Sequence, residues 1–105
     1  MNDKLKEKDF SILRKLYSNP KISQRDLAYT LGFSVGKLNY CLKALKNKGL
    51  IKIKNFSKNP NKHSYSYLLT SKGVSHKSKM AFYFMKQKMK EYEDLKKELE
   101  NNEKN

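Results

Sequence analysis

The sequence has 105 residues and carries 24 Lys and Arg against 10 Asp and Glu, which gives a formal net charge of +14. One domain with a modest core is expected at this length, which argues against an enzyme built around a large pocket. The single cysteine, Cys41, excludes a disulfide framework or a multi-cysteine zinc site within the chain. The charged segment 1–10 has no signal-peptide pattern, and no apolar run approaches the roughly 18 residues of a membrane span. We therefore expect a soluble, cytoplasmic protein.

The positive charge is concentrated in the middle of the chain. Residues 10–90 carry 18 Lys and Arg and a single acid, Asp26, whereas residues 91–105 carry three Lys and six acids. A body of this composition repels itself unless a polyanion neutralises it, and nucleic acid is the commonest such partner. The alternative is a solubilising Lys-rich surface encoded by an AT-rich genome. That bias explains the excess of Lys over Arg but not the scarcity of acids, so we favour nucleic acid.

The first third of the chain predicts two helices. Apolar residues recur at helical spacing over residues 9–18, and the Asn-Pro pair at 19–20 then stops the helix. Ser23 is a favourable N-cap for a second helix, Asp26 completes a capping-box pattern, and Gly32 is placed to end that helix.

The same pattern repeats in a third helix, with Ser34 as its N-cap and Gly49 as its terminator. The predicted buried stripe of this helix consists of Val35, Leu38, Leu42 and Leu45. Cys41 lies at the edge of the stripe, where we expect a small core residue rather than a redox switch. Two short helices joined by a Gly-containing turn are a helix-turn-helix.

A β-hairpin is predicted after the third helix. Ile51 and Ile53 alternate with lysines, which is typical of a half-buried strand. A second strand with the same alternation contains Tyr65, Tyr67 and Leu69. The polar loop between the strands carries Lys58 and Lys62. A basic hairpin directly after a helix-turn-helix is a wing.

A long helix is predicted from its N-cap, Thr70, to about Glu100. Its apolar residues are Val74, Ala81, Phe82, Met85, Met89, Tyr92, Leu95 and Leu99. A helix of about 30 residues is about 45 Å long and overshoots a small body, so its distal stripe needs another surface. The simplest partner is a second copy of the helix. We predict dimerisation through Met85, Met89, Tyr92, Leu95 and Leu99. The alternative is that Phe82, Phe84 and Met85 only pack on the first helix of the same chain, as we expect of the proximal half.

These elements predict a mainly α fold with a small β-hairpin. In this prediction residues 1–70 form a winged helix-turn-helix DNA-binding domain, and residues 71–105 form a long C-terminal dimerisation helix. The second helix of a helix-turn-helix enters the major groove, and its outer face reads base edges. The residues that this helix would present to DNA are Ser34, Gly36, Lys37, Asn39, Tyr40, Lys43 and Asn47.

Each of these residue types suits the task. Lys donates to guanine or phosphate, Asn pairs with adenine through two hydrogen bonds, and Tyr donates to phosphate or lies against a thymine methyl group. Ser23, Gln24 and Arg25, at the N-terminus of the preceding helix, are expected to bind a phosphate. Lys58 and Lys62 are expected at the adjacent minor groove or its phosphates.

Four runs of sequence carry a family resemblance: Ile22-Ser-Gln-Arg-Asp-Leu-Ala, Leu31-Gly-Phe-Ser, Gly36-Lys-Leu-Asn-Tyr-Cys-Leu-Lys-Ala-Leu and Lys48-Gly-Leu-Ile-Lys-Ile-Lys-Asn-Phe. They are similar to the winged helix-turn-helix of MarR-type regulators, above all to the small subgroup associated with exopolysaccharide gene clusters. The resemblance covers roughly residues 8–98 and implies a dimeric DNA-binding transcriptional regulator of polysaccharide-related genes. Larger MarR proteins add terminal helices that build a ligand pocket. This chain has one long terminal helix, so no small-molecule effector is assigned.

We therefore predict a homodimeric, sequence-specific regulator that binds double-stranded DNA without a cofactor or a metal. One alternative is RNA binding or ribosome association, with Tyr65 and Tyr67 stacking on bases, although their alternation places them toward the core. A second is an adaptor that works through its tail and has lost contact with DNA, which the concentrated positive charge opposes. Enzymatic activity is not expected, because His63 and His76 are isolated and no phosphate loop or metal-ligand spacing appears.

Overall fold

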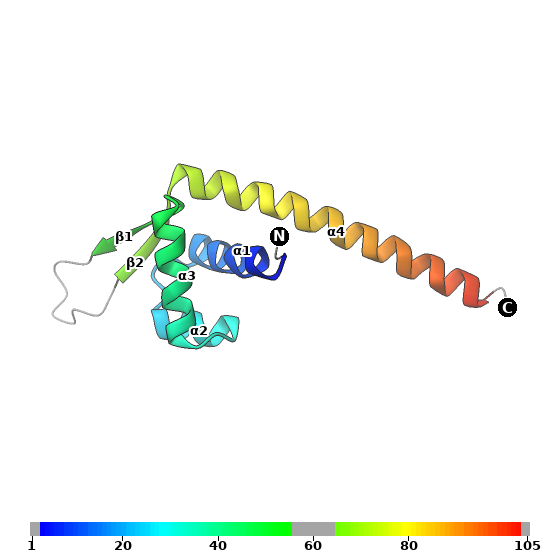
Figure 1. The fold of residues 1–105 in the computed structure, drawn as a ribbon, viewed down its shortest axis with the longest axis horizontal. Helices are drawn as coiled ribbons and strands as arrows, with labels where there is room; N and C mark the ends of the chain where they lie inside the picture. Colours follow the sequence, from blue (N-terminus) through cyan, green and yellow to red (C-terminus); the bar gives the residue numbers. More distant parts are fainter. Residues whose placement is uncertain (1–2, 56–64, 104–105) are drawn as a thin grey trace.

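The computed structural model describes residues 3–55 and 65–103. The elements in these ranges are α1 (Asp3–Ser18), α2 (Gln24–Leu31), α3 (Val35–Asn47), β1 (Ile51–Asn55), β2 (Tyr65–Leu69) and α4 (Ser71–Glu103). The first half of α4 lies along the winged body, and its second half projects beyond the body along the 68 Å long axis of the molecule (Figure 1). This arrangement confirms the predicted mainly α fold with a small hairpin, a winged helix-turn-helix and a long C-terminal helix.

The helix ends follow the local signals in the sequence. The hydroxyl oxygen of Ser23 accepts the backbone N–H of Asp26 at 3.0 Å, and that of Ser34 accepts the backbone N–H of Lys37 at 3.1 Å. Gly32 ends α2 with a positive φ of 71°. Gly49, with φ of 74°, follows α3 in the same left-handed conformation, which favours glycine. The predicted caps and terminators of α2 and α3 are therefore confirmed.

The first helix is longer than predicted, because α1 begins at Asp3 rather than near Asp9. The predicted start was set by the first apolar residue of the periodic pattern, Phe10. The residues before it, 3–9, are mostly Lys, Glu and Leu, which have high helix propensity and extend a helix without an apolar repeat that would predict it. Apolar periodicity therefore located the packed part of α1 and missed its N-terminal extension.

The two strands pair antiparallel, with Ile51 opposite Leu69 and Ile53 opposite Tyr67. The expected alternation of buried and exposed residues holds only in part. Ile53 is 42% exposed because β1 leaves the body toward the wing, and Ser66 is 4% exposed although it was expected to face solvent. Since Ser66 and its neighbour Tyr67 point to opposite faces and both are buried, β2 is covered on both faces where it contacts α1.

The start of α4 is bound tightly to the end of α3. The Thr70 hydroxyl donates to the Gly49 carbonyl oxygen at 2.6 Å and accepts the backbone N–H of Gly73 at 3.0 Å, which confirms Thr70 as the predicted N-cap. The backbone N–H of Thr70 donates to the carbonyl oxygen of Leu50 at 3.0 Å. Gly73 presses on the same carbonyl group, which a β-carbon at this position would overlap. Only glycine permits this close approach of two backbones.

The core joins all the helices to the sheet. Its fully buried side chains are Ile12, Leu13, Leu16, Leu27, Leu38 and Leu45. Met80 of α4 is also buried, and the Phe84 ring stacks on the Phe10 ring of α1 with 5.2 Å between centroids. Both contacts place the inner face of α4 against α1.

The sequence pattern placed this inner face incorrectly. Ala81 was counted with the apolar seam and Met80 was not, yet Met80 is buried and Ala81 is exposed. Phe82 and Met85, considered for packing on α1, are also exposed, and only Phe84 of the three packs there. The reason is rotational phase: α4 carries apolar residues on two faces, and only the tertiary structure decides which face meets α1.

Candidate nucleic-acid interface

The outer face of α3 is free of the rest of the described chain. The inner face of the helix is formed by Leu38, Cys41, Leu42 and Leu45, all of them buried. On the opposite side Gly36, Lys37, Asn39, Tyr40, Lys43 and Asn47 are exposed. Tyr40 is 76% exposed, so it projects well beyond the backbone. We call these six residues the outer face of α3.

Val35 departs from the predicted buried stripe, because it is 49% exposed. Side chains in a helix lean toward its N-terminus, so the side chain of the first residue extends past the end of the core. Leu38, one turn later, is fully buried. Val35 therefore adds an apolar group beside the outer face of α3, and such a group can contact a thymine methyl.

Lys37 has two neighbours that sequence reasoning did not place beside it. Its ammonium group lies 5.1 Å from the centroid of the Phe33 ring. On its other side α1 brings Lys8 close. Hydrogen bonding to Lys37 is the main cause of a lowered pKa at Lys8, and desolvation and repulsion between the two ammonium groups lower it further. A bound anion such as a phosphate would favour the charged forms of these two amino groups.

The N-terminus of α2 offers a mixed set of groups. The hydroxyl oxygens of Ser23 and Ser34 are already engaged as N-caps. Arg25 is exposed, and the part-buried Gln24 has an Nε2 without a hydrogen-bond partner among the described residues. Asp26 lies in the same turn and satisfies part of the positive helix end. Arg25 and the Gln24 amide are therefore the groups with free donors here.

The wing is described only at its base. Lys52 and Lys54 of β1 are exposed and were not named as site residues. The alternation with Ile51 and Ile53 that predicted the strand also predicts their exposure, so the signal for them was present. Lys58 and Lys62 lie outside the described residues, and their predicted role stays a prediction.

Six of the ten acidic residues of the chain lie in the distal part of α4. Those of residues 91–103 are on the half of α4 that projects beyond the body (Figure 1). Asp9 is part-buried, with its carboxylate 4.0 Å from the Lys48 ammonium. Burial raises the pKa of Asp9, while Lys48 and His76 oppose the shift. The electrostatic environment of α3 is therefore dominated by lysine.

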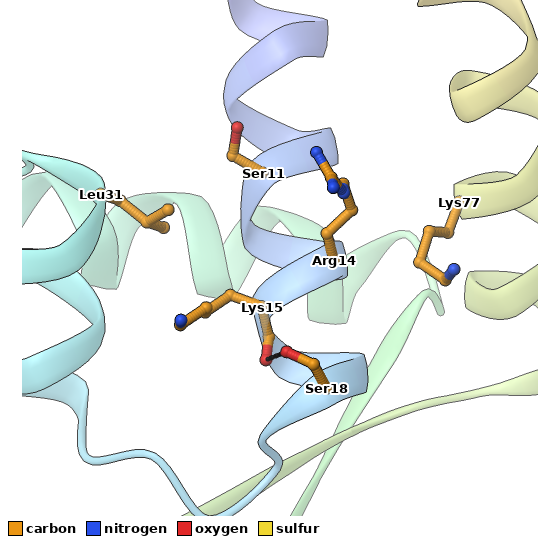
Figure 2. A pocket seen from close by; sticks show the side chains of 6 residues that line it. All are labelled: Ser11, Arg14, Lys15, Ser18, Leu31 and Lys77. Atoms are coloured by element: carbon orange, nitrogen blue, oxygen red, sulfur yellow. Dashed lines mark hydrogen bonds between the residues drawn. The ribbon is translucent and has the colours of Figure 1, made fainter. Parts of the chain in front are cut away.

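A basic cleft, which sequence reasoning did not find, lies where α1, α2 and α4 meet. It has a volume of about 450 Å³ and is lined by Ser11, Arg14, Lys15, Ser18, Leu31 and Lys77 (Figure 2). The Lys77 ammonium lies 4.4 Å from the centroid of the Tyr17 ring, and the Arg14 guanidinium lies 5.3 Å from that of Phe10. No sequence motif joins these residues, because three separate helices contribute them.

The described residues hold neither a cluster of metal ligands nor a membrane-spanning helix. Cys41 is buried as predicted, and burial, followed by the charge of Asp9, raises the pKa of its thiol. Residues 3–55 and 65–103 contain no cluster of His, Cys, Asp and Glu that could hold a metal ion. In the same ranges no helix combines the length and apolarity that crossing a bilayer requires.

A known domain family resembles the body of the molecule. Residues 5–52 match the family model described as winged helix-turn-helix DNA-binding. This segment contains most of α1 and all of α2 and α3 and ends in β1, so it includes the whole outer face of α3. No curated protein sequence matches the chain significantly.

Solved structures of MarR-family regulators share the fold. The transcriptional repressor CouR, bound to a 23-mer DNA duplex, is 29% identical with a TM-score of 0.61, over 69% of this chain and 49% of that one. The MarR repressor of Listeria monocytogenes is 22% identical with a TM-score of 0.60, over 84% of this chain and 59% of that one. ZitR of Lactococcus lactis is 22% identical with a TM-score of 0.70, over 91% and 70%. The matched part is thus about half of CouR and six tenths of the Listeria protein.

Proposed function

We propose that this protein is a sequence-specific, double-stranded-DNA-binding transcriptional regulator of the MarR type. The observation that carries the proposal is the outer face of α3, which is exposed, rich in lysine and amide groups, and held rigidly by a buried opposite face. The likeness to CouR, whose structure holds a DNA duplex, supports the same use of the fold. The excess of 17 positive charges over residues 10–90 supplies the attraction to phosphates.

Base reading is assigned to α3. Asn39 pairs with adenine, Lys43 binds guanine or phosphate, and Tyr40 lies on a phosphate or a thymine methyl group. The supporting contacts on α3 are Ser34, Gly36, Lys37 and Asn47. Phosphates are held at the start of α2 by Ser23, Gln24 and Arg25, and beside the wing by Lys58 and Lys62.

The active form in this proposal is a homodimer. Two copies place their α3 helices in two major grooves of a pseudo-palindromic site, separated by one helical turn of about 34–36 Å or by a multiple of it. The exposed stripe Met85, Met89, Tyr92, Leu95 and Leu99 forms the dimer contact. The motifs shared with exopolysaccharide-associated regulators support polysaccharide-related target genes and a cytoplasmic location.

The test is a selection for preferred duplexes from random-sequence DNA, followed by fluorescence anisotropy with the winning site. Lys43→Ala should weaken binding to every duplex and reduce the salt dependence by about one counterion. Asn39→Ala should instead relax the preference at a single base, at a cost of about 1–3 kcal/mol at that position. Lys97→Ala, on the exposed distal part of α4, is the matched control and should change neither. If Lys43→Ala and Asn39→Ala bind and discriminate like the parent, the placement of α3 in the groove is wrong.

The structure argues against one of the two tyrosines that the RNA-binding alternative would use. Tyr67 is buried and cannot stack on a base without unpacking the core. Competition between a duplex DNA and a structured RNA of equal charge, at moderate salt, separates the two functions. Displacement of the DNA by RNA at equal concentration would favour the alternative.

A further inference from the structure

We propose that two copies of α4 pair in antiparallel orientation over residues 78–103, so that the basic half of each helix lies on the acidic half of the other. This inference rests on the proposed homodimer and adds its geometry. It draws on the exposed stripe of α4, on the spacing of that stripe, and on the charge gradient along the helix.

The distal half of α4 has no covering in the described molecule. Every residue from Lys88 to Asn102 is exposed. The exposed stripe includes large apolar groups, from Met85 at 50% to Leu99 at 64% exposed. A long helix that remains unpaired in solution has charged residues on every side. An apolar stripe of this length instead marks a contact surface.

The stripe has the spacing of a coiled-coil seam. Phe82, Met85, Met89, Tyr92, Lys96 and Leu99 follow one another at alternating intervals of three and four residues. Lys96 is the one polar position, and Leu95 beside it broadens the seam. The face formed by Gly73, Met80 and Phe84 packs on the body, and Met85 at the near end of the seam borders a cleft between α4 and α1. Met85 is half exposed and the later seam residues lie beyond this cleft, so a partner helix can lie on the seam without displacing α1.

The charge of α4 reverses in the middle of this seam. Residues 78–90 carry four lysines and no acid, whereas residues 91–103 carry six acids and two lysines. The two segments therefore have net charges of +4 and −4. In a parallel pair each segment would face the segment of like charge along the whole contact. In an antiparallel pair each basic segment, with a net charge of +4, faces the acidic segment of the other helix, with a net charge of −4.

The register follows from placing the twofold axis of the antiparallel pair at the centre of the seam. The seam is centred between Lys90 and Glu91, so Met89 meets Tyr92 of the partner subunit, and Phe82 meets Leu99 of the partner subunit. Beside the seam, Lys86 comes near Glu93 of the partner subunit. The intrahelical pair of Lys88 and Glu91, with 3.5 Å between Nζ and Oε2, adds local support to the helix at its centre.

Charge reversal tests the orientation in the full-length protein. Reversing Lys86, Lys88 and Lys90 to Glu should weaken self-association by about tenfold or more, because attraction becomes repulsion across the whole contact. Reversing Glu91, Glu93 and Asp94 to Lys in the same chain should restore it. In a parallel pair the first change only replaces one like-charge contact by another, so unchanged self-association in sedimentation equilibrium would overturn the proposal. All six side chains are exposed, so the variants should fold.

Disulfide trapping in a Cys41→Ala background gives an independent result. In the antiparallel register two copies of Leu99 are about 25 Å apart along the axis, at 1.5 Å per residue, so Leu99→Cys alone should not cross-link. Phe82→Cys with Leu99→Cys should give a covalent dimer. Cross-linking by Leu99→Cys alone would overturn the orientation and leave the homodimer standing. A monomeric mass for the parent protein in light scattering would overturn both, and a dimer that cross-links in neither design would overturn the register.

Discussion

The winged body and the distal half of α4 contain the same apolar residue types but differ in how these residues are buried and in the charge of the surrounding surface. In the body, leucines such as Leu13, Leu38 and Leu45 are fully buried by their own chain, and the surface is basic. In the distal half of α4, Leu95 and Leu99 are exposed and the surface is acidic. The comparison teaches that the body completes its core within one chain, whereas the same chain leaves the apolar stripe of α4 uncovered.

The sharpest test of this comparison removes one leucine from each region. Leu45→Ala should lower the free energy of unfolding of the body by about 3 kcal/mol, because it leaves a cavity in a fully packed core. Leu99→Ala should lower the stability of the body by less than about 0.5 kcal/mol, because its side chain has no neighbours to lose within the monomer. Urea unfolding at a protein concentration low enough to keep the protein monomeric measures both, because in a dimer Leu99→Ala would also weaken the contact with the partner. Comparable losses in the two variants would contradict the division between regions.

The joint between the regions predicts the next largest effect. Gly73→Ala should destabilise the protein by about 2 kcal/mol, since its β-carbon would overlap the Leu50 carbonyl group and force the start of α4 away from α3. Gly36→Ala is the matched control, because its β-carbon would meet open space, and alanine favours the helix by up to about 1 kcal/mol. Thermal unfolding followed by circular dichroism should therefore shift in opposite directions for the two variants.

The smallest expected effect is the pH dependence of Asp9. Burial raises the pKa of Asp9 above its ordinary value of 3.8, so the folded state binds more protons than the unfolded state just above that pH. The stabilising contribution is therefore complete below pH 3.8 and is lost as the pH rises through the raised pKa. Asp9→Asn removes this dependence, so the difference in stability between parent and variant should change only within this window. A constant difference from acid to neutral pH would show that Asp9 titrates normally.

The helix-turn-helix could be predicted well from local signals in the sequence. The packing of distant elements on one another could not be predicted in this way. Ser23, Ser34, Thr70 and the two terminating glycines act on backbone groups a few residues away, so their roles could be read from spacing alone. The inner face of α4 could not, because Met80 and Phe82 are equally apolar and only the orientation of α4 on α1 separates them.

The candidate interface divides in the same way. The exposure of Asn39, Tyr40 and Lys43 follows from the buried stripe of their own helix, so it could be predicted. The approach of Lys8 to Lys37 joins two helices across the molecule, and no periodicity encodes it. The exposure of Val35 depends on where the core ends, which the spacing of apolar residues does not show.

The hydrogen bonds that join Thr70 to Gly49 and Leu50 make α4 a lever attached to the end of α3. A rod of 33 residues is about 50 Å long, so a tilt of about 5° at its base moves its tip by about 4 Å. Conversely, a contact that holds the tip of α4 also restrains the orientation of α3. The tip of α4 and the orientation of α3 are thus coupled, although the two are not in contact.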